Sequence, residues 1–170
     1  MKSKKSIVLI GMMGSGKSSI GKILSKKLKL DFIDIDNKIE EIEKKSISEI
    51  FNKKGEGYFR KIEESVSISY LKLQNKIISL GGGAYINQNI RNQCLKSSIS
   101  VWLNWKDETL INRIRNSKKR PLVMKLSPLE IKKLIAERSK IYNSSNFKIN
   151  CDKLEKVQIV KKIIKHYENT

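Results

Sequence analysis

Cysteine, proline and histidine are scarce in this chain of 170 residues. Its two cysteines, Cys94 and Cys151, lie far apart and form no C-x-x-C pattern, and the single His166 has no metal-ligand partner in the sequence. This composition argues against a disulfide-stabilised secreted module and against a zinc finger, and we expect both thiols to be reduced. With only two prolines the chain has no proline-rich linker.

Long apolar runs are also missing. No run approaches the roughly 18 apolar residues of a membrane-spanning helix. Lys2, Lys4 and Lys5 precede an apolar stretch, as in a signal peptide, but that stretch is only residues 7–10, whereas a signal peptide needs roughly 7–15 apolar residues. We therefore expect a cytoplasmic protein with no membrane partner. The length is that of about one domain, covering residues 1–170.

Negative charge is in short supply: 17 Asp and Glu residues face 36 Lys and Arg residues, a formal net charge of +19. Such a balance is typical of nucleic-acid-binding proteins. Aromatic residues make up only 6% of the chain, however, and no basic tract carries interleaved aromatic residues that would stack on bases. We therefore predict no nucleic-acid partner and a lysine-covered surface that mildly attracts anionic ligands.

What the chain does have is a glycine-rich segment directly after its first apolar run. Residues 11–18 read Gly-Met-Met-Gly-Ser-Gly-Lys-Ser, which matches the phosphate-binding loop G-x-x-x-x-G-K-[ST]. A strand-like run precedes the segment and a helical pattern follows it, as the motif requires. In this motif backbone N–H groups cradle phosphate oxygens, Lys17 reaches the β- and γ-phosphates, and the Ser18 hydroxyl ligates Mg²⁺. The sequence therefore predicts a site for a nucleoside triphosphate.

Short apolar runs alternate with helical patterns along the whole chain. This alternation predicts an α/β domain of three layers, with helices on both faces of a parallel sheet. Helix starts are indicated by Ser46, Ser127 and Asp152, each of which stands three residues before a Glu. Between the second and third strands the pattern predicts three helices. The five expected strands cover residues 6–10, 31–35, 76–80, 99–103 and 147–151.

Unusual residues follow two of these strands, at the edge where parallel sheets bind ligands. In an extended segment Asp34 and Asp36 share a face, so that one carboxylate can hold Mg²⁺ through water while the other orients or deprotonates an acceptor hydroxyl. The alternative is that Asp36 only caps a helix. Gly81, Gly82 and Gly83 end the third strand, and three successive glycines indicate a backbone that lies close to a ligand.

Several arginines stand out in a chain whose basic residues are mostly lysine. Arginine is preferred where a carboxylate or phosphate is bound through two parallel hydrogen bonds. Arg60 stands three residues before Glu63, which fits either a surface ion pair or a fork that binds a carboxylate. We predict that residues 113–127 form a lid which brings Arg120 onto the phosphoryl group during its transfer.

Taken in order, these motifs resemble the shikimate kinase family. The residues that carry the resemblance are the phosphate loop, Asp34 and Asp36, Phe59-Arg60 with Glu63, the triple glycine, Arg120-Pro121-Leu122, and Arg138 with Tyr142. The resemblance spans essentially the whole chain. It implies phosphorylation of the 3-hydroxyl of shikimate by ATP with Mg²⁺, a sheet order of 2-3-1-4-5, and a small helical substrate-binding subdomain at about residues 34–62.

The resemblance also implies roles for individual residues, in a protein that we expect to be a monomer. The catalytic residues would be Lys17, Asp36 and Arg120. Mg²⁺ would be held by Ser18 and, through water, by Asp34. The apolar wall of the substrate pocket would be Phe51 and Phe59. The nucleotide would be bound by Gly14, Ser15, Gly16, Lys17, Ser18, Ser19, Arg113 and Arg120, with Arg113 against adenine. Shikimate would be bound by Asp36, Arg60, Gly81, Gly82, Gly83 and Arg138.

The residue types alone leave other functions open. A gluconate kinase or a nucleoside monophosphate kinase is the nearest rival, because gluconate also carries a carboxylate for the arginines. A nucleotide-binding relative that has lost catalysis would show damage at Lys17, Asp36 or Arg120, and all three residues are intact. A nucleic-acid-stimulated NTPase is suggested by charge alone.

Overall fold

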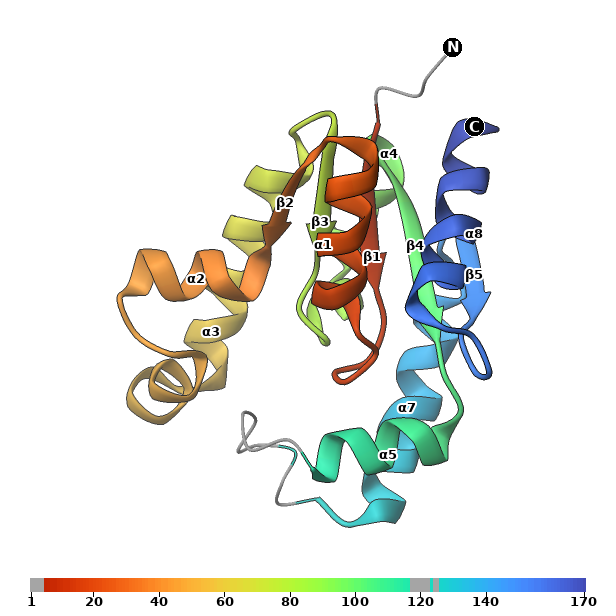
Figure 1. The fold of residues 1–170 in the computed structure, drawn as a ribbon. Coiled ribbons are helices and arrows are strands. Elements are labelled where there is room, and N and C mark those ends of the chain that lie inside the picture. The colour runs from red at the N-terminus through yellow and green to blue at the C-terminus, as the bar shows by residue number, and fades with distance from the viewer. Residues whose placement is uncertain (1–4, 117–122, 124–125) are drawn as a thin grey trace.

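Five parallel strands form a single sheet at the centre of the molecule (Figure 1). The computed structural model describes residues 5–116, 123 and 126–170. The strand order is β2-β3-β1-β4-β5, which confirms the expected order and the fold class. The strands are β1 (Ser6–Ile10), β2 (Asp31–Asp34), β3 (Lys76–Ser79), β4 (Ser98–Asn104) and β5 (Phe147–Asn150).

Helices connect successive strands, as a parallel sheet requires. They are α1 (Lys17–Leu28), α2 (Ile35–Glu43), α3 (Ile47–Leu71), α4 (Gln88–Ser97), α5 (Asp107–Arg115), α7 (Pro128–Tyr142) and α8 (Lys156–Glu168), with a short 3₁₀ helix at Ala84–Ile86. Two helices rather than three lie between β2 and β3. The expected break between the second and third appears as a kink inside α3, where Gly55 has non-helical backbone angles (φ 80°, ψ 169°).

The alternation of side chains along β1 divides the core into two clusters. Ile7 and Leu9 pack in a cluster with residues of α1 and α8, such as Ile20 and Ile159. Val8 and Ile10 pack on the opposite face with residues of α2, α3, α4 and α7. Every residue of β1 is buried, which explains why this strand reads as a continuous apolar run.

The carboxyl ends of the strands lie between two groups of helices (Figure 1). Helix α2 and the beginning of α3 lie on one side, and α5 and α7 lie on the other. The expected substrate-binding subdomain, residues 34–62, corresponds to α2 and the first part of α3, and it remains a prediction. The expected lid, residues 113–127, lies largely outside the described residues. None of the described helices is long and apolar enough to cross a membrane.

Two of the three predicted helix starts are confirmed. Ser46 and Ser127 each accept a hydrogen bond from the backbone N–H of the Glu three residues on, and that Glu carboxylate accepts one from the Ser N–H in return. The third prediction was wrong, since Glu155 and not Asp152 caps α8. The Asp152 carboxylate is already engaged, because it accepts hydrogen bonds from the Lys106 N–H (2.8 Å) and the Thr109 hydroxyl (3.3 Å).

The cap of α7 gives a test of local stability. Ser127→Ala removes the hydroxyl that accepts from Glu130 N–H, so we expect the free energy of unfolding to fall by about 1 kcal/mol. Urea unfolding followed by circular dichroism measures the loss. Ser139→Ala, which removes a hydroxyl elsewhere on the same helix, is the control and should change the free energy of unfolding much less. Equal losses in the two variants would contradict the assignment of the cap.

Candidate active site

The phosphate loop connects β1 to the N-terminus of α1, with Gly16 as the residue that caps the helix. The Lys17 side chain is only 7% exposed, and it folds back over the loop. Its ammonium donates to the carbonyl oxygens of Gly11 (2.8 Å) and Met12 (3.0 Å). Backbone N–H groups at a helix N-terminus together with a buried ammonium make a site for the phosphates of a nucleotide.

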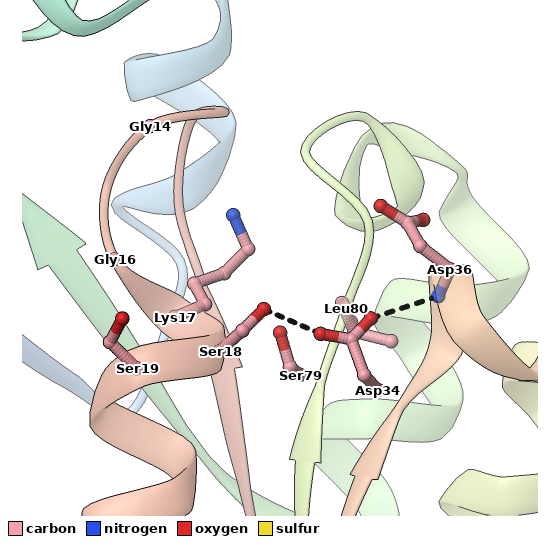
Figure 2. Close-up of a pocket in the computed structure, with 9 residues that line it drawn as sticks. All are labelled: Gly14, Gly16, Lys17, Ser18, Ser19, Asp34, Asp36, Ser79 and Leu80. Atoms are coloured by element: carbon pink, nitrogen blue, oxygen red, sulfur yellow. Dashed lines mark hydrogen bonds between the residues drawn. The ribbon is translucent and has the colours of Figure 1, made fainter. Parts of the chain in front are cut away.

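A pocket opens beside this loop and reaches the ends of β2 and β3 (Figure 2). It brings together most of the residues predicted to bind nucleotide and metal, although they come from separate segments of the chain. The lining residues are Gly14, Gly16, Lys17, Ser18, Ser19, Asp34, Asp36, Ser79 and Leu80. Ser79 and Leu80 were not predicted, and their position directly before the triple glycine is the sequence signal that points to them.

Asp34 links the phosphate loop to the start of α2. One carboxylate oxygen accepts from the Ser18 hydroxyl (2.5 Å) and the other accepts from the Asp36 N–H (3.1 Å) (Figure 2). Asp34 is therefore the N-cap of α2, and Asp36 lies in the first helical turn. Both expectations about local structure were wrong: the two residues do not share one extended segment, and Asp36 is not the cap. Since β2 ends at Asp34, it is the turn into the helix that directs both carboxylates to the pocket.

The triple glycine passes between charged side chains. A Cβ atom at Gly81 would stand 2.7 Å from a Glu63 carboxylate oxygen and 2.8 Å from an Asp36 carboxylate oxygen. A Cβ atom at Gly83 would stand 2.9 Å from Arg60 Nη1 and 3.4 Å from Arg138 Nη2. Only glycine permits this close approach, so the loop brings two carboxylates and two guanidinium groups to neighbouring backbone positions.

Helix α7 holds the middle of this loop. Arg138 Nη1 donates to the carbonyl oxygen of Gly82 (3.1 Å), and the hydroxyl of Tyr142 donates to the same oxygen. Tyr142 is 1% exposed and packs against the Trp102 ring, with the ring centroids 5.8 Å apart. The spacing of Arg138 and Tyr142 by four residues places both on one face of the helix. Tyr142 was part of the motif formed with Arg138, but the sequence did not predict its contact with Gly82.

Glu63 is the most deeply buried acid at this site, with 2% of the residue exposed. Its carboxylate forms an ion pair with Arg60 Nη1 at 2.7 Å. Burial raises the pKa of Glu63 above its usual value of 4.5, and nearby Asp36 acts in the same direction, while Arg60 and Arg138 act against it. The rest of the Arg60 guanidinium pairs with the exposed Glu56, whose carboxylate accepts from Nε (3.3 Å) and Nη2 (3.2 Å). Both alternatives for Arg60 thus remain, because a buried carboxylate orients a guanidinium whose outer edge holds an exposed acid that a ligand carboxylate would have to displace.

Arg113 lies on the outer side of the phosphate loop. Its Nη1 donates to the Gly14 carbonyl oxygen (3.1 Å), and its guanidinium stacks on the Trp105 ring, 4.0 Å from the centroid. Trp105 was not predicted as a site residue, although it comes directly after the end of β4. Phe51 and Phe59 pack together with ring centroids 4.5 Å apart. Arg120 lies outside the described residues, and its expected role remains a prediction.

Comparison with known proteins decides the family. The family model described as shikimate kinase matches residues 13–168. The shikimate kinase of Sulfurihydrogenibium sp. (strain YO3AOP1) is 42% identical over 161 residues, covering 94% of this chain and 96% of that protein. The chain belongs to the shikimate kinase family.

Solved structures of shikimate kinases have the same fold over nearly the whole chain. The enzyme from Aquifex aeolicus is 38% identical, with a TM-score of 0.86 and 96% of each chain covered. The enzyme from Acinetobacter baumannii, solved in complex with shikimate, is 28% identical, with a TM-score of 0.91 over 97% of this chain and 93% of that one. The resemblance seen in the motifs is therefore confirmed.

The buried acid gives a pH-dependent prediction. Because the pKa of Glu63 is higher in the folded than in the unfolded chain, the unfolded chain loses its proton first as the pH rises above 4.5. The free energy of unfolding of the wild type, minus that of Glu63→Gln, should therefore fall as the pH rises through this range. Urea unfolding at a series of pH values measures this difference.

Glu49→Gln is the control with the opposite sign. Hydrogen bonds from the Ser46 backbone and side chain lower the pKa of Glu49, so the corresponding difference should rise as the pH rises toward 4.5 and level off above that value. Parallel pH profiles for the two variants would contradict the assignment of Glu63 as an acid weakened by burial.

Proposed function

We propose that the protein transfers the γ-phosphoryl group of ATP to the 3-hydroxyl of shikimate, giving shikimate 3-phosphate and ADP. The observation that carries this proposal is the meeting of two guanidinium groups at Gly83, next to the phosphate loop, in a chain of this family. Shikimate carries one carboxylate and several hydroxyls. Two arginines for the carboxylate and an aspartate for the hydroxyls are the complementary set.

The donor side of the proposed site consists of the phosphate loop and Arg113. Backbone N–H groups of Gly14, Ser15, Gly16, Ser18 and Ser19, with the Lys17 ammonium, would hold the phosphates. The Lys17 ammonium donates to the carbonyl oxygens of Gly11 and Met12, so phosphate oxygens would compete with these acceptors when ATP binds. Arg113, which donates a hydrogen bond to the Gly14 carbonyl oxygen, would contact the rest of the nucleotide.

The donor set at the loop fits Mg²⁺. Ser18 and Asp34 offer hydroxyl and carboxylate oxygens, the ligands that this ion prefers. Among the described residues no group of three His, Cys, Asp or Glu side chains could hold a metal ion, so Mg²⁺ would depend on phosphate oxygens and water for its other ligands. We propose that Ser18 binds Mg²⁺ directly and Asp34 through water. Bound there, the ion would neutralise charge on the phosphates.

The acceptor side would lie next to the Asp36 end of the pocket, where the triple glycine passes. Arg60 and Arg138 would hold the shikimate carboxylate, and the backbone of Gly81, Gly82 and Gly83 would line the pocket beside the ring. Asp36 would hold the hydroxyls and accept the proton of the attacking 3-hydroxyl as its oxygen bonds to the γ-phosphorus. The bond from that phosphorus to the bridging oxygen breaks, and ADP leaves. Lys17 and Arg120 would stabilise the charge on the phosphoryl group.

The protein is proposed to act as a monomer in the cytoplasm. Cys94 and Cys151 are both free and buried, which suits a reducing compartment.

An ADP-release assay over a panel of acceptors tests the function. With Mg²⁺ and ATP supplied, we expect shikimate to give the fastest release, and quinate, gluconate and nucleoside monophosphates to give little. The reason is that a pocket built for hydroxyl groups in one arrangement rejects analogues that leave its polar groups unpaired. A folded protein that releases no ADP with shikimate, or more with gluconate, would contradict the proposal.

Asp36→Asn tests the proposed base. The amide cannot accept the hydroxyl proton, so we expect kcat to fall by a factor on the order of 10²–10⁴ while the Kd of ADP stays within about twofold. Asp31→Asn is the matched control, because Asp31 is an exposed acid at the other end of β2 that pairs with Lys76. It should keep kcat near the wild-type value. An Asp36→Asn enzyme as fast as the control would remove Asp36 from the mechanism.

A further inference from the structure

Trp105 joins two parts of the nucleotide site that are distant in sequence. It follows Asn104, the last residue of β4, and it packs against both core clusters. Its indole N–H donates to the Ser15 carbonyl oxygen, with 2.9 Å between Nε1 and the oxygen. The Arg113 guanidinium stacks on its ring and donates a hydrogen bond to the Gly14 carbonyl oxygen. Both contacts end on the phosphate loop.

The first contact determines how one peptide of the loop is oriented. In a trans peptide the carbonyl oxygen and the N–H of the next residue point in opposite directions. Holding the Ser15 carbonyl toward Trp105 therefore turns the Gly16 N–H to the other side, where Gly16 lines the pocket. Gly16 has φ 86°, a conformation open to glycine, so without the indole this peptide has more freedom to rotate.

The second contact holds Arg113 in place. Helix α5 lies directly on the loop, since a Cβ atom at Gly14 would stand 3.3 Å from the Arg113 Cβ. Arg113 is on the exposed surface, where a long side chain has many rotamers. Stacking on an indole face restricts it, because a planar cation is attracted to the ring electrons. Among the described residues Arg113 remains exposed, so a ligand at the phosphate loop would be able to reach it.

We propose that Trp105 is a positioning residue for the nucleotide, acting on phosphate through the Ser15–Gly16 peptide and on the base through Arg113. The inference rests on the proposed function only in taking ATP as the donor. Trp105 would have two separate effects: its indole N–H would affect phosphate binding, and its ring would affect binding of the rest of the nucleotide.

Two substitutions separate these actions. Trp105→Phe keeps an aromatic face for Arg113 and removes the donor, whereas Trp105→Leu removes both. The probes are inorganic pyrophosphate, which has no base, adenosine, which has no phosphate, and ADP, which has both. Titration calorimetry measures the Kd of ADP, and displacement of ADP measures those of the weaker ligands.

For Trp105→Phe we expect pyrophosphate and ADP to bind roughly threefold to tenfold more weakly, as suits the loss of one hydrogen bond, while adenosine binding is unchanged. Trp105→Leu should in addition weaken adenosine. Unchanged pyrophosphate binding in Trp105→Phe would overturn the proposal. An equal loss for adenosine and pyrophosphate in that variant would also overturn it, because it would indicate a merely structural role.

Trp102→Phe is the matched control, since Trp102 lies in β4, three residues before Trp105, and contacts Tyr142 and Lys148. Its pyrophosphate and ADP affinities should stay within about twofold of the wild type. The chain has two tryptophans, so this variant leaves Trp105 as the only indole fluorophore. Its emission should change saturably with pyrophosphate, which tests the contact without altering Trp105. A flat response at saturating pyrophosphate would overturn the proposal.

None of these measurements contains shikimate. A wrong acceptor would therefore leave the pyrophosphate and adenosine results as they are, and a wrong role for Trp105 would leave the acceptor panel unaffected. The two failures can be told apart.

Discussion

Two positive charges are held against one backbone position, and much of the site's architecture follows from this constraint. Arg60 comes from α3 and Arg138 from α7, on opposite sides of the strand ends, yet both guanidinium groups lie within 3.4 Å of the place where a Gly83 side chain would begin. Like charges at this separation repel, and the repulsion must be offset by nearby negative groups. Glu56 and Glu63 supply them on the α3 side, and the Gly82 carbonyl oxygen supplies a partial charge on the α7 side.

How deeply each carboxylate beside Arg60 is buried bears on how a ligand carboxylate would bind at this site. Burial raises the pKa of Glu63, so its charge is held at a cost, whereas Glu56 is exposed and pairs with Arg60 Nη2 at 3.2 Å. A carboxylate that enters between the arginines would compete with Glu56 for the Arg60 guanidinium. Because an exposed ion pair is weak, an anionic acceptor would displace Glu56 at little cost, and acceptors without a carboxylate would gain less from the same site.

How much could be predicted from the sequence depended on whether a feature is local. The phosphate loop, the strands and the two serine caps were recognised because strand, loop and cap signals lie within a few residues of one another. The order of the strands came from the resemblance. Asp34 and Asp36 were correctly placed at the end of β2, but the switch from strand to helix between them was missed because a capping Asp looks the same at either position.

Trp105 and the burial of Glu63 could not be predicted in this way. The Trp105 indole meets a carbonyl 90 positions earlier in the chain, and the contact exists only because β4 lies beside β1 in the sheet. The burial of Glu63 depends likewise on where the loop after β3 crosses α3. Both features follow from the packing of separate elements, on which the pattern of neighbouring residues carries no information.

The hydrogen bond between Ser18 and Asp34 determines where the hydrogen of the Ser18 hydroxyl points. A serine hydroxyl has one hydrogen and two lone pairs, and Asp34 takes the hydrogen. Both lone pairs of Ser18 are therefore left to face away from Asp34, so the oxygen is already turned as a metal ligand must be. An arriving Mg²⁺ would meet lone pairs rather than a proton, and the aspartate would serve the ion through the serine as well as through water.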